Sequence, residues 1–255
     1  MKILKFTLSG KTAFFKDRSV NSVVYFTHGN IHKVAVLGIF GAIMGYGGYS
    51  EQFGYIKENK KKEKYPPFYE KFKDTRISIV PNSKNGNFPK KQQVFNNSVG
   101  YASKEETGNL IVKEIWLENP SWDIYIQITS GEAEKLAERL MERTCVYIPY
   151  LGTRDHIADI YNVEMFDFCE VDWKNVRNID CLVPEDLCKF SLMSRIEMMT
   201  SKNQEKEFKM SEFLPMELDG DTNQHILKKM VYTNMKLKES SEKIYKVNEK
   251  NIVFY

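Results

Sequence analysis

The sequence has few cysteines, and their spacing suggests neither a metal site nor a disulfide framework. The four thiols are Cys145, Cys169, Cys181 and Cys188. No two of them form a CxxC pair, and no histidine follows them at a zinc-ligand spacing. We therefore expect reduced, mostly buried thiols, and nothing in the sequence calls for a metal or another cofactor.

Long hydrophobic runs are also lacking. The longest apolar run, Val34 to Tyr46, is shorter than the roughly 20 residues that a membrane-spanning helix needs. Lys2, Lys5 and Lys11 interrupt the apolar stretch that a secretory signal would require. These absences predict a cytoplasmic protein that does not contact a membrane.

The charges are divided unevenly along the chain. A length of 255 residues allows one domain with a large insertion, or one domain with a small appendage, at about 150 residues per domain. Residues 1 to 100 carry 17 Lys+Arg and 6 Asp+Glu, whereas residues 101 to 255 carry 20 and 28, so a net charge of +3 conceals halves of +11 and −8. The electropositive half is typical of a protein that binds a polyanion such as nucleic acid.

Hydrophobic periodicity predicts a strand and a buried helix at the start of the chain. Leu4, Phe6 and Leu8 alternate with polar residues, which is typical of a half-buried strand. A helix is expected from Val34 to Met44, with Asn30 as its N-cap and Gly45 as its C-terminal stop. The glycines at positions 38, 41 and 45 clear one face, which we expect to lie close against a sheet.

Further elements follow the same patterns. Alternation predicts strands at Ile77 to Ile79, ended by Pro81, and at Ile124 to Ile128. A helix over Ala133 to Met141 is expected, with Thr129 and Glu132 as its capping pair. A fourth strand is expected at Val146 to Tyr150.

This order of elements is the βαββαβ pattern of an α+β, ferredoxin-like (RRM-like) domain. We assign it to residues 1–155, with a long insertion at about 82–122 between the middle strands. Residues 156–255 are expected to form a smaller β-rich subdomain, because Ala158 to Val171 and Val231 to Leu237 have extended patterns. Ile244 to Val247 and Ile252 to Phe254 are expected to pair as a hairpin.

A few residues near the first helix have side chains suited to RNA chemistry. His28, His32, Lys33 and Tyr46 form a conceivable set for a metal-independent ribonuclease, which needs a general base, a general acid and a cation. His32 and Lys33 could instead hold a phosphate at the helix N-terminus. A third possibility is that they are simply exposed residues ahead of a buried helix.

The insertion combines lysines and amides with aromatic residues such as Phe88, Phe95 and Tyr101. Aromatic rings stack on bases and lysines neutralise phosphates, so this composition suits single-stranded RNA. A solvated hairpin without a ligand has the same composition and remains an alternative.

Several segments resemble, in order, those of the fifth CRISPR-associated family (Cas-five, in the RAMP superfamily), most closely the members of subtype I-B systems. They are LKFTLSGKTAFFK, KVAVLGIFGAIMGYGGY, NPSWDIYIQIT, YLGTRDHIADI and FLPMEL. The resemblance spans nearly the whole chain and is strongest up to residue 160.

The resemblance implies a non-catalytic subunit of a Cascade surveillance complex that caps the 5′ handle of the CRISPR RNA in antiviral defence. It implies an insertion that acts as a thumb against a neighbouring Cas-seven backbone subunit, contact with the large Cas-eight subunit, Cas-six as a further candidate partner, and only indirect contact with target DNA. Residues expected to contact RNA are Lys16, Arg18, Asn21, Ser22, His28, His32, Lys33, Tyr46, Lys84, Lys90, Lys91, Gln92, Gln93, Asn96 and Arg154.

One branch of the family, in subtype I-C, is itself an endoribonuclease that processes precursor CRISPR RNA with a tyrosine and an adjacent Lys-His pair. This sequence has no Lys-His dipeptide and carries the reverse order, His32-Lys33. The resemblance therefore favours a subunit without nuclease activity, and the endoribonuclease is the alternative.

Overall fold

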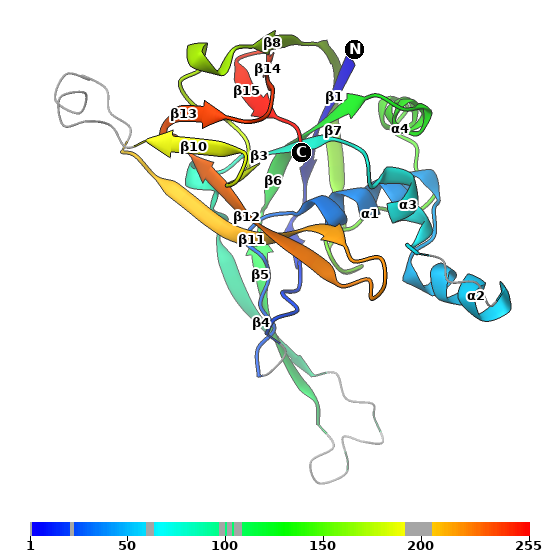
Figure 1. Cartoon of the computed structure of the whole chain (residues 1–255). Coiled ribbons are helices and arrows are strands. Elements are labelled where there is room, and N and C mark those ends of the chain that lie inside the picture. The colour runs from blue at the N-terminus through cyan, green and yellow to red at the C-terminus, as the bar shows by residue number, and fades with distance from the viewer. Residues whose placement is uncertain are drawn as a thin grey trace.

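The computed structural model describes residues 2–20, 23–59, 64–96, 100, 104, 109–191 and 206–255, and it is a strand-rich mixed α/β fold (Figure 1). No helix in these ranges is both long and apolar enough to cross a membrane. The helices are α1 (Lys33–Met44), α2 (Tyr49–Asn59), α3 (Pro67–Phe72) and α4 (Gly131–Met141), with 3-10 turns η1 (Lys84–Gly86) and η3 (Trp173–Asn175).

A four-stranded sheet lies at the centre of the fold. Its strands occur in the order β3-β6-β1-β7, and every neighbouring pair is antiparallel. Their bounds are Ile77–Pro81 for β3, Ser121–Ile128 for β6, Lys2–Ser9 for β1 and Asp159–Asp167 for β7. Along the chain these strands and two helices follow the order β1, α1, β3, β6, α4, β7.

The fourth strand differs from the prediction. Val146 to Tyr150 is not a strand, and β7 takes the fourth place in the sheet. The amides of Val146 and Tyr147 donate instead to the carbonyls of Ile43 and Ala42, 3.1 and 3.0 Å away, so this segment closes the end of α1. Because β7 lies beyond residue 155 and pairs with β1, the sheet crosses the division that we drew there.

Both faces of the central sheet are covered. Leu4, Phe6 and Leu8 pack with α1 and α4 in one apolar core, which also includes Leu214 of β11 (Lys209–Leu218). The opposite face contributes Ile3, Val80 and Tyr125 to a second core with the C-terminal strands. Because both faces are covered, every residue of β3 is buried, including the polar Ser78.

The C-terminal strands form small sheets beside the central one. The hairpin expected from Ile244 to Phe254 is confirmed as β14 paired with β15. The remaining strands are β8 (Cys169–Val171), β9 (Val183–Pro184), β10 (Cys188–Ser191), β12 (His225–Thr233), β13 (Lys236–Ser240), β14 (Ile244–Val247) and β15 (Lys250–Val253).

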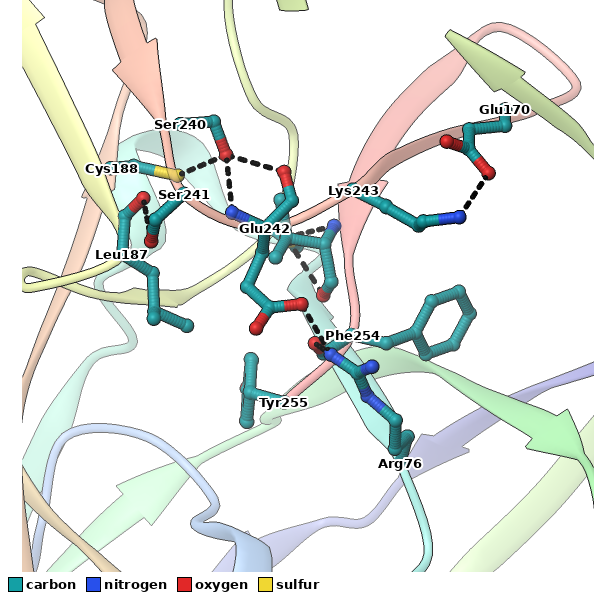
Figure 2. Close-up of polar contacts among 12 residues, drawn as sticks. Arg76, Glu170, Leu187, Cys188, Ser240, Ser241, Glu242, Lys243, Phe254 and Tyr255 are labelled. Carbon is teal, nitrogen blue, oxygen red and sulfur yellow. Dashed lines mark hydrogen bonds and ion pairs between the residues drawn. The ribbon is translucent and has the colours of Figure 1, made fainter.

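Arg76, next to β3, forms hydrogen bonds that link the C-terminal strands to the central sheet (Figure 2). Its Nη2 atom donates to the carbonyl of Phe254 at 2.7 Å and to Glu242 at 2.6 Å. Tyr255 then exchanges backbone hydrogen bonds with Ile77 at 3.1 and 3.2 Å. The end of the described chain is therefore tied to an edge strand of the central sheet.

The helix caps lie one or two residues from their predicted positions. His32, not Asn30, caps α1: its Nδ1 atom accepts from the amide of Ala35 at 3.2 Å. Asn30 instead joins Trp122 Nε1 to the carbonyl of Gly86. Ser130, not Thr129, caps α4. Gly45 ends α1 at φ 82°, as predicted, because a left-handed residue favours glycine.

The glycine face of α1 contacts a helix and not a sheet, which corrects the prediction. A Cβ atom on Gly41 would lie 2.4 Å from Cβ of Phe68 in α3, whereas one on Gly38 would meet only Phe68 Cε2, at 4.0 Å. Gly41 therefore sets the distance between α1 and α3, and Gly38 faces open space.

We expect opposite effects from alanine at these two glycines. Gly41→Ala should destabilise the fold by about 2 kcal/mol, because α3 must move away from an overpacked contact. Gly38→Ala should stabilise it by roughly 0.5–1 kcal/mol through helix propensity. Urea unfolding of the two variants measures both, and equal stabilities would contradict the packing of α1 on α3.

The predicted insertion contains a β-hairpin that extends away from the rest of the molecule (Figure 1). Its strands are β4 (Lys90–Asn96) and β5 (Ile111–Glu118), and β5 also pairs with β2 (Thr12–Ala13). Leu117 of β5 is buried in the main core, but Ile111 is 60% exposed and Val94 is 47% exposed, so the part of the hairpin farther from the core leaves its apolar residues exposed. Tyr101 lies outside the described residues.

All four cysteines are free thiols. Cys181 and Cys188 are buried, but Cys145 and Cys169 are exposed, so burial was predicted correctly for two of the four.

Candidate nucleic-acid interface

A groove of about 620 Å³ runs along α1. Its floor is the helix face of Ala35, Gly38 and Ala42, which repeats at helical spacing. Aromatic residues border it, and its volume lies in the range that holds one small ligand. The residues at its borders include Phe14, Phe15, Lys16, Arg18, His32, Tyr46, Tyr49, Glu51, Phe68, Tyr147, Ile148, Tyr150, Gly152, Thr153 and His225.

Cationic side chains lie at the end of the groove near the start of α1. Lys16 and Arg18 follow β2, in a segment held by a bridge between Lys16 and Thr27 and by the Asp17 amide, which donates to Phe26 at 2.8 Å. The Asp17 carboxylate accepts from its neighbour Ser19 at 2.7 Å. This carboxylate is therefore held by its own turn, while both cations line the groove.

Lys16 and Arg18 each lie beside an aromatic ring. Lys16 Nζ is 3.9 Å from the ring centroid of Tyr25. Arg18 neighbours Tyr49; burial raises the pKa of the Tyr49 phenol, and the guanidinium opposes that rise. Both cations are exposed, so each can still donate hydrogen bonds to a bound anion.

Three histidines meet at the same end of the groove. The ring of His32 lies 5.7 Å from that of His28 and 5.5 Å from that of His225, which is on β12. Burial lowers the pKa of His32 well below its usual value. Burial, with the charge of Arg18 next, lowers the pKa of His225 to about 4. Both rings are therefore neutral at pH 7.

Tyr46 lies at the other end of α1, and its hydroxyl is occupied. It donates to Glu132 of α4, and burial together with this carboxylate raises the pKa of Tyr46 to about 12. His28 also has a carboxylate neighbour, with Nδ1 at 3.8 Å from Glu212, which accepts from the amide of Gly29.

Lys33 does not line the groove. Its side chain is buried, and Nζ donates to the carbonyl of Tyr255 at 3.1 Å. Burial lowers its pKa to about 8. The phosphate contact that we expected for Lys33 beside His32 is therefore replaced by a contact inside the protein, because adjacent helix residues point in different directions.

The remaining predicted residues lie apart from the groove or beyond the described chain. Lys90, Lys91, Gln92 and Asn96 are exposed on β4 and Gln93 is half-buried there, while Lys84 is exposed on η1. Lys91 faces Glu118 at 3.7 Å. Arg154 is exposed in the turn that follows Thr153 at the groove. Asn21 and Ser22 lie outside the described residues.

The turn around Gly152 forms one wall of the groove. The amide of Phe14 donates to the carbonyl of Leu151 at 3.1 Å, and Leu151 is fully buried. Gly152 has φ +93°, and a Cβ atom there would lie 1.9 Å from the Phe14 carbonyl oxygen. Only glycine allows the turn to approach the backbone of Phe14, just after β2, this closely.

Sequence reasoning missed several groove residues, among them Tyr49, Glu51, Tyr147, Tyr150 and His225. The exposed fractions of Tyr147 and Tyr150 are 59% and 45%. The tyrosines lie in the quoted segments GYGGY and YLGTRDH or just before them, so an aromatic search beside those turns could have found them. No local pattern points to His225.

Comparison with models of protein families finds no match for this sequence. Comparison with curated proteins also finds none.

Among solved structures, the fold is similar to a chain of a CRISPR RNA-guided surveillance complex, with 12% sequence identity over 92% of this chain and 91% of that chain, at a TM-score of 0.50. It is also similar to a CRISPR protein from Archaeoglobus fulgidus, at 7% identity over 99% of each chain and a TM-score of 0.47. A third similar structure is a Cas protein, at 11% identity over 92% and 95% of the two chains and a TM-score of 0.43. The chain thus has a fold like that of a surveillance-complex subunit.

Proposed function

We propose that this protein is a non-catalytic RNA-binding subunit of a type I CRISPR surveillance complex and that it caps the 5′ handle of the CRISPR RNA in the cytoplasm. The observation that carries the proposal is the groove on α1, which Lys16 and Arg18 line together with the exposed Tyr49, Tyr147 and Tyr150. It lies on a fold similar to that of a chain from an RNA-guided complex. The ferredoxin-like, Cas-five and I-B assignments belong to this proposal.

The groove suits a single RNA strand better than a duplex. Single strands are held by cations on phosphates and by aromatic rings on bases, and both kinds of side chain border this groove. A volume of about 620 Å³ accommodates a nucleotide but not a double helix.

The β4–β5 hairpin supports the proposed partners. Its apolar residues Val94, Phe95 and Ile111 are exposed, and an isolated two-stranded ribbon is only marginally stable in water. We assign this hairpin to a Cas-seven backbone subunit, and we assign contacts of the acidic C-terminal half to the large Cas-eight subunit.

The geometry near α1 disfavours nuclease chemistry. His32 Nδ1 accepts from a backbone amide, and burial keeps the ring neutral. The hydroxyl of Tyr46 is bonded to Glu132 and its pKa is about 12, far from the pH at which a general acid or base works well. The predicted set is therefore better suited to structural roles than to proton transfer.

Loss of the groove cations should weaken RNA binding. We expect Lys16→Ala combined with Arg18→Ala to lower the affinity for a labelled RNA that carries the 5′ handle by about 10- to 100-fold at ~0.1 M salt. The slope of log K against log salt should fall by about 1.4, because each phosphate contact on a single strand contributes roughly 0.7. Fluorescence anisotropy over a salt series measures both quantities.

Two control variants separate local contacts from net charge. Lys189→Ala with Lys243→Ala removes the same charge from exposed residues that pair with Glu239 and Glu170, and it should change neither quantity. Lys33→Met should also leave the slope unchanged, because Lys33 Nζ bonds Tyr255. Equal affinity for RNA without the handle would contradict the proposal. A discrete cleavage product in EDTA that His32→Ala abolishes would replace it with the endoribonuclease.

A further inference from the structure

The groove along α1 has two chemically different ends. Lys16, Arg18 and the histidine cluster lie at the start of the helix, whereas Glu51 and Phe68 lie towards its other end. Tyr49 lies between the two ends of the groove, because its phenol neighbours Arg18 and its ring centroid is 6.0 Å from that of Phe68. A ligand with an anionic part and a flat apolar part would be bound in one orientation.

The floor of the groove is built from small residues. Ala35, Gly38 and Ala42 leave the helix backbone open to the groove, and a Cβ atom at Gly38 would meet only Phe68 Cε2, at 4.0 Å. Tyr147 borders the half near the end of α1; its amide bonds Ala42, and its side chain is 59% exposed. A flat ring can lie over the glycine and stack on tyrosine without moving the helix.

A carboxylate borders the same half. Glu51 accepts from the hydroxyl of Tyr55 at 3.2 Å, and its Oε2 atom leans over Gly47, where a Cβ atom would lie 1.7 Å away. An ionised carboxylate only accepts hydrogen bonds, so it favours a base with an exocyclic amino group and repels phosphate. Glu51 therefore directs the phosphate to the opposite end.

We propose that the groove binds one unstacked nucleotide of the RNA, with its base over Gly38 between Tyr49 and Tyr147 and its phosphate beside Lys16 and Arg18. The base carries an amino group that donates to Glu51, as in cytosine or adenine. This inference rests on the proposed function and adds the orientation and chemical class of the bound nucleotide.

The test fills the floor of the groove while leaving the cations in place. Gly38→Leu places a side chain where the base would lie. Its matched control is Gly54→Leu in α2, which is also a helical glycine; a Cβ atom there would meet nothing within 4 Å, and Gly54 does not border the groove. The probes are labelled oligo(C), oligo(U) and an abasic ribose-phosphate strand, each of about eight units.

We expect the unmodified protein to bind oligo(C) about tenfold tighter than oligo(U), because only cytosine has an amino group that donates to Glu51. It should bind oligo(C) at least tenfold tighter than the abasic strand, because one stacked base contributes about that much. Gly38→Leu should bind oligo(C) no better than the abasic strand, with an unchanged salt slope, while Gly54→Leu behaves as the unmodified protein. Glu51→Gln should bring the affinities for oligo(C) and oligo(U) together. Thermal melting checks that each variant is folded.

The outcomes separate this inference from the proposed function. If all three probes bind equally and Gly38→Leu has no effect, the base does not enter the groove, although the protein still binds RNA. If none of the probes binds at low salt, and the handle RNA does not bind either, the proposed function itself is wrong.

Discussion

Gly152→Ala should destabilise the protein by about 4 kcal/mol, the largest single-residue effect that we expect. A Cβ atom at this position would lie 1.9 Å from the carbonyl oxygen of Phe14 and 2.6 Å from its carbonyl carbon. Neither atom belongs to a flexible side chain, so the backbone itself must move. Overpacking of this kind costs roughly 1–3 kcal/mol, and a left-handed φ costs a non-glycine residue about 1–2 kcal/mol more.

The matched control is Gly131→Ala at the first position of α4. A Cβ atom there meets nothing within 4 Å, so this variant should be at least as stable as the unmodified protein. Urea unfolding followed by circular dichroism measures both. A Gly152→Ala protein with the unmodified midpoint would mean that the turn does not approach Phe14 as closely as the structure places it.

Gly152 also connects stability to the groove. Phe14, Gly152 and Thr153 all border the groove, and the neighbouring Leu151 is fully buried. A turn displaced by a methyl group would move the wall that carries Tyr150. The close approach is therefore required both for the fold and for the shape of the proposed RNA site.

Local sequence patterns were sufficient to predict the helices and strands whose buried positions are the apolar residues of their own segment. The structure contains the strands predicted near Leu4, Ile77 and Ile124 and the helices predicted at Val34 to Met44 and Ala133 to Met141. The C-terminal hairpin was found in the same way. In each case the residues that face a core are the ones that create the pattern. The structure also contains α2 and α3, which the sequence analysis did not predict.

The fourth strand shows where local patterns fail. Val146 to Tyr150 is rich in residues that favour strands, but its first two amides bond carbonyls of α1. The actual fourth strand, β7, lies within Ala158 to Val171, where an extended pattern was predicted but assigned to the C-terminal subdomain. Its partner β1 lies at the other end of the domain sequence, and no local signal specifies that pairing.

The candidate site was predictable only in part for the same reason. Lys16, Arg18, His32 and Tyr46 were selected by residue type near the first helix, and all four border the groove. His225 comes from β12, so only the tertiary fold brings it to His32. Lys33 was assigned to phosphate because sequence does not specify which direction the first residue of a helix faces.

As the pH falls, the free energy of unfolding should start to decrease before the carboxylates titrate. His225 should account for much of this decrease. Its pKa falls from an ordinary 6.5 to about 4 in the folded protein, mainly through burial. The unfolded chain therefore binds a proton first as the pH decreases. Stability is complete above about pH 6.5 and is lost as the pH falls from 6.5 towards 4.

A shift of this size corresponds to about 3 kcal/mol, and screening at a half-buried ring reduces it to about 2 kcal/mol. His32 acts in the same direction, since burial also lowers its pKa. Carboxylates with lowered pKa values, such as Asp123, lose their contribution only below about pH 4, so the two effects occupy different pH ranges.

Urea unfolding at pH 7.0, 6.0 and 5.0 tests this expectation. The free energy of unfolding should fall with pH in the unmodified protein, and His225→Gln should remove about half of that fall because glutamine does not titrate. The control is Gln224→His, which places an additional imidazole at an exposed neighbouring position and should leave the fall unchanged. If His225→Gln retains the full pH dependence, His225 is not held neutral against Arg18 and His28, and the histidine cluster cannot be neutral as we infer.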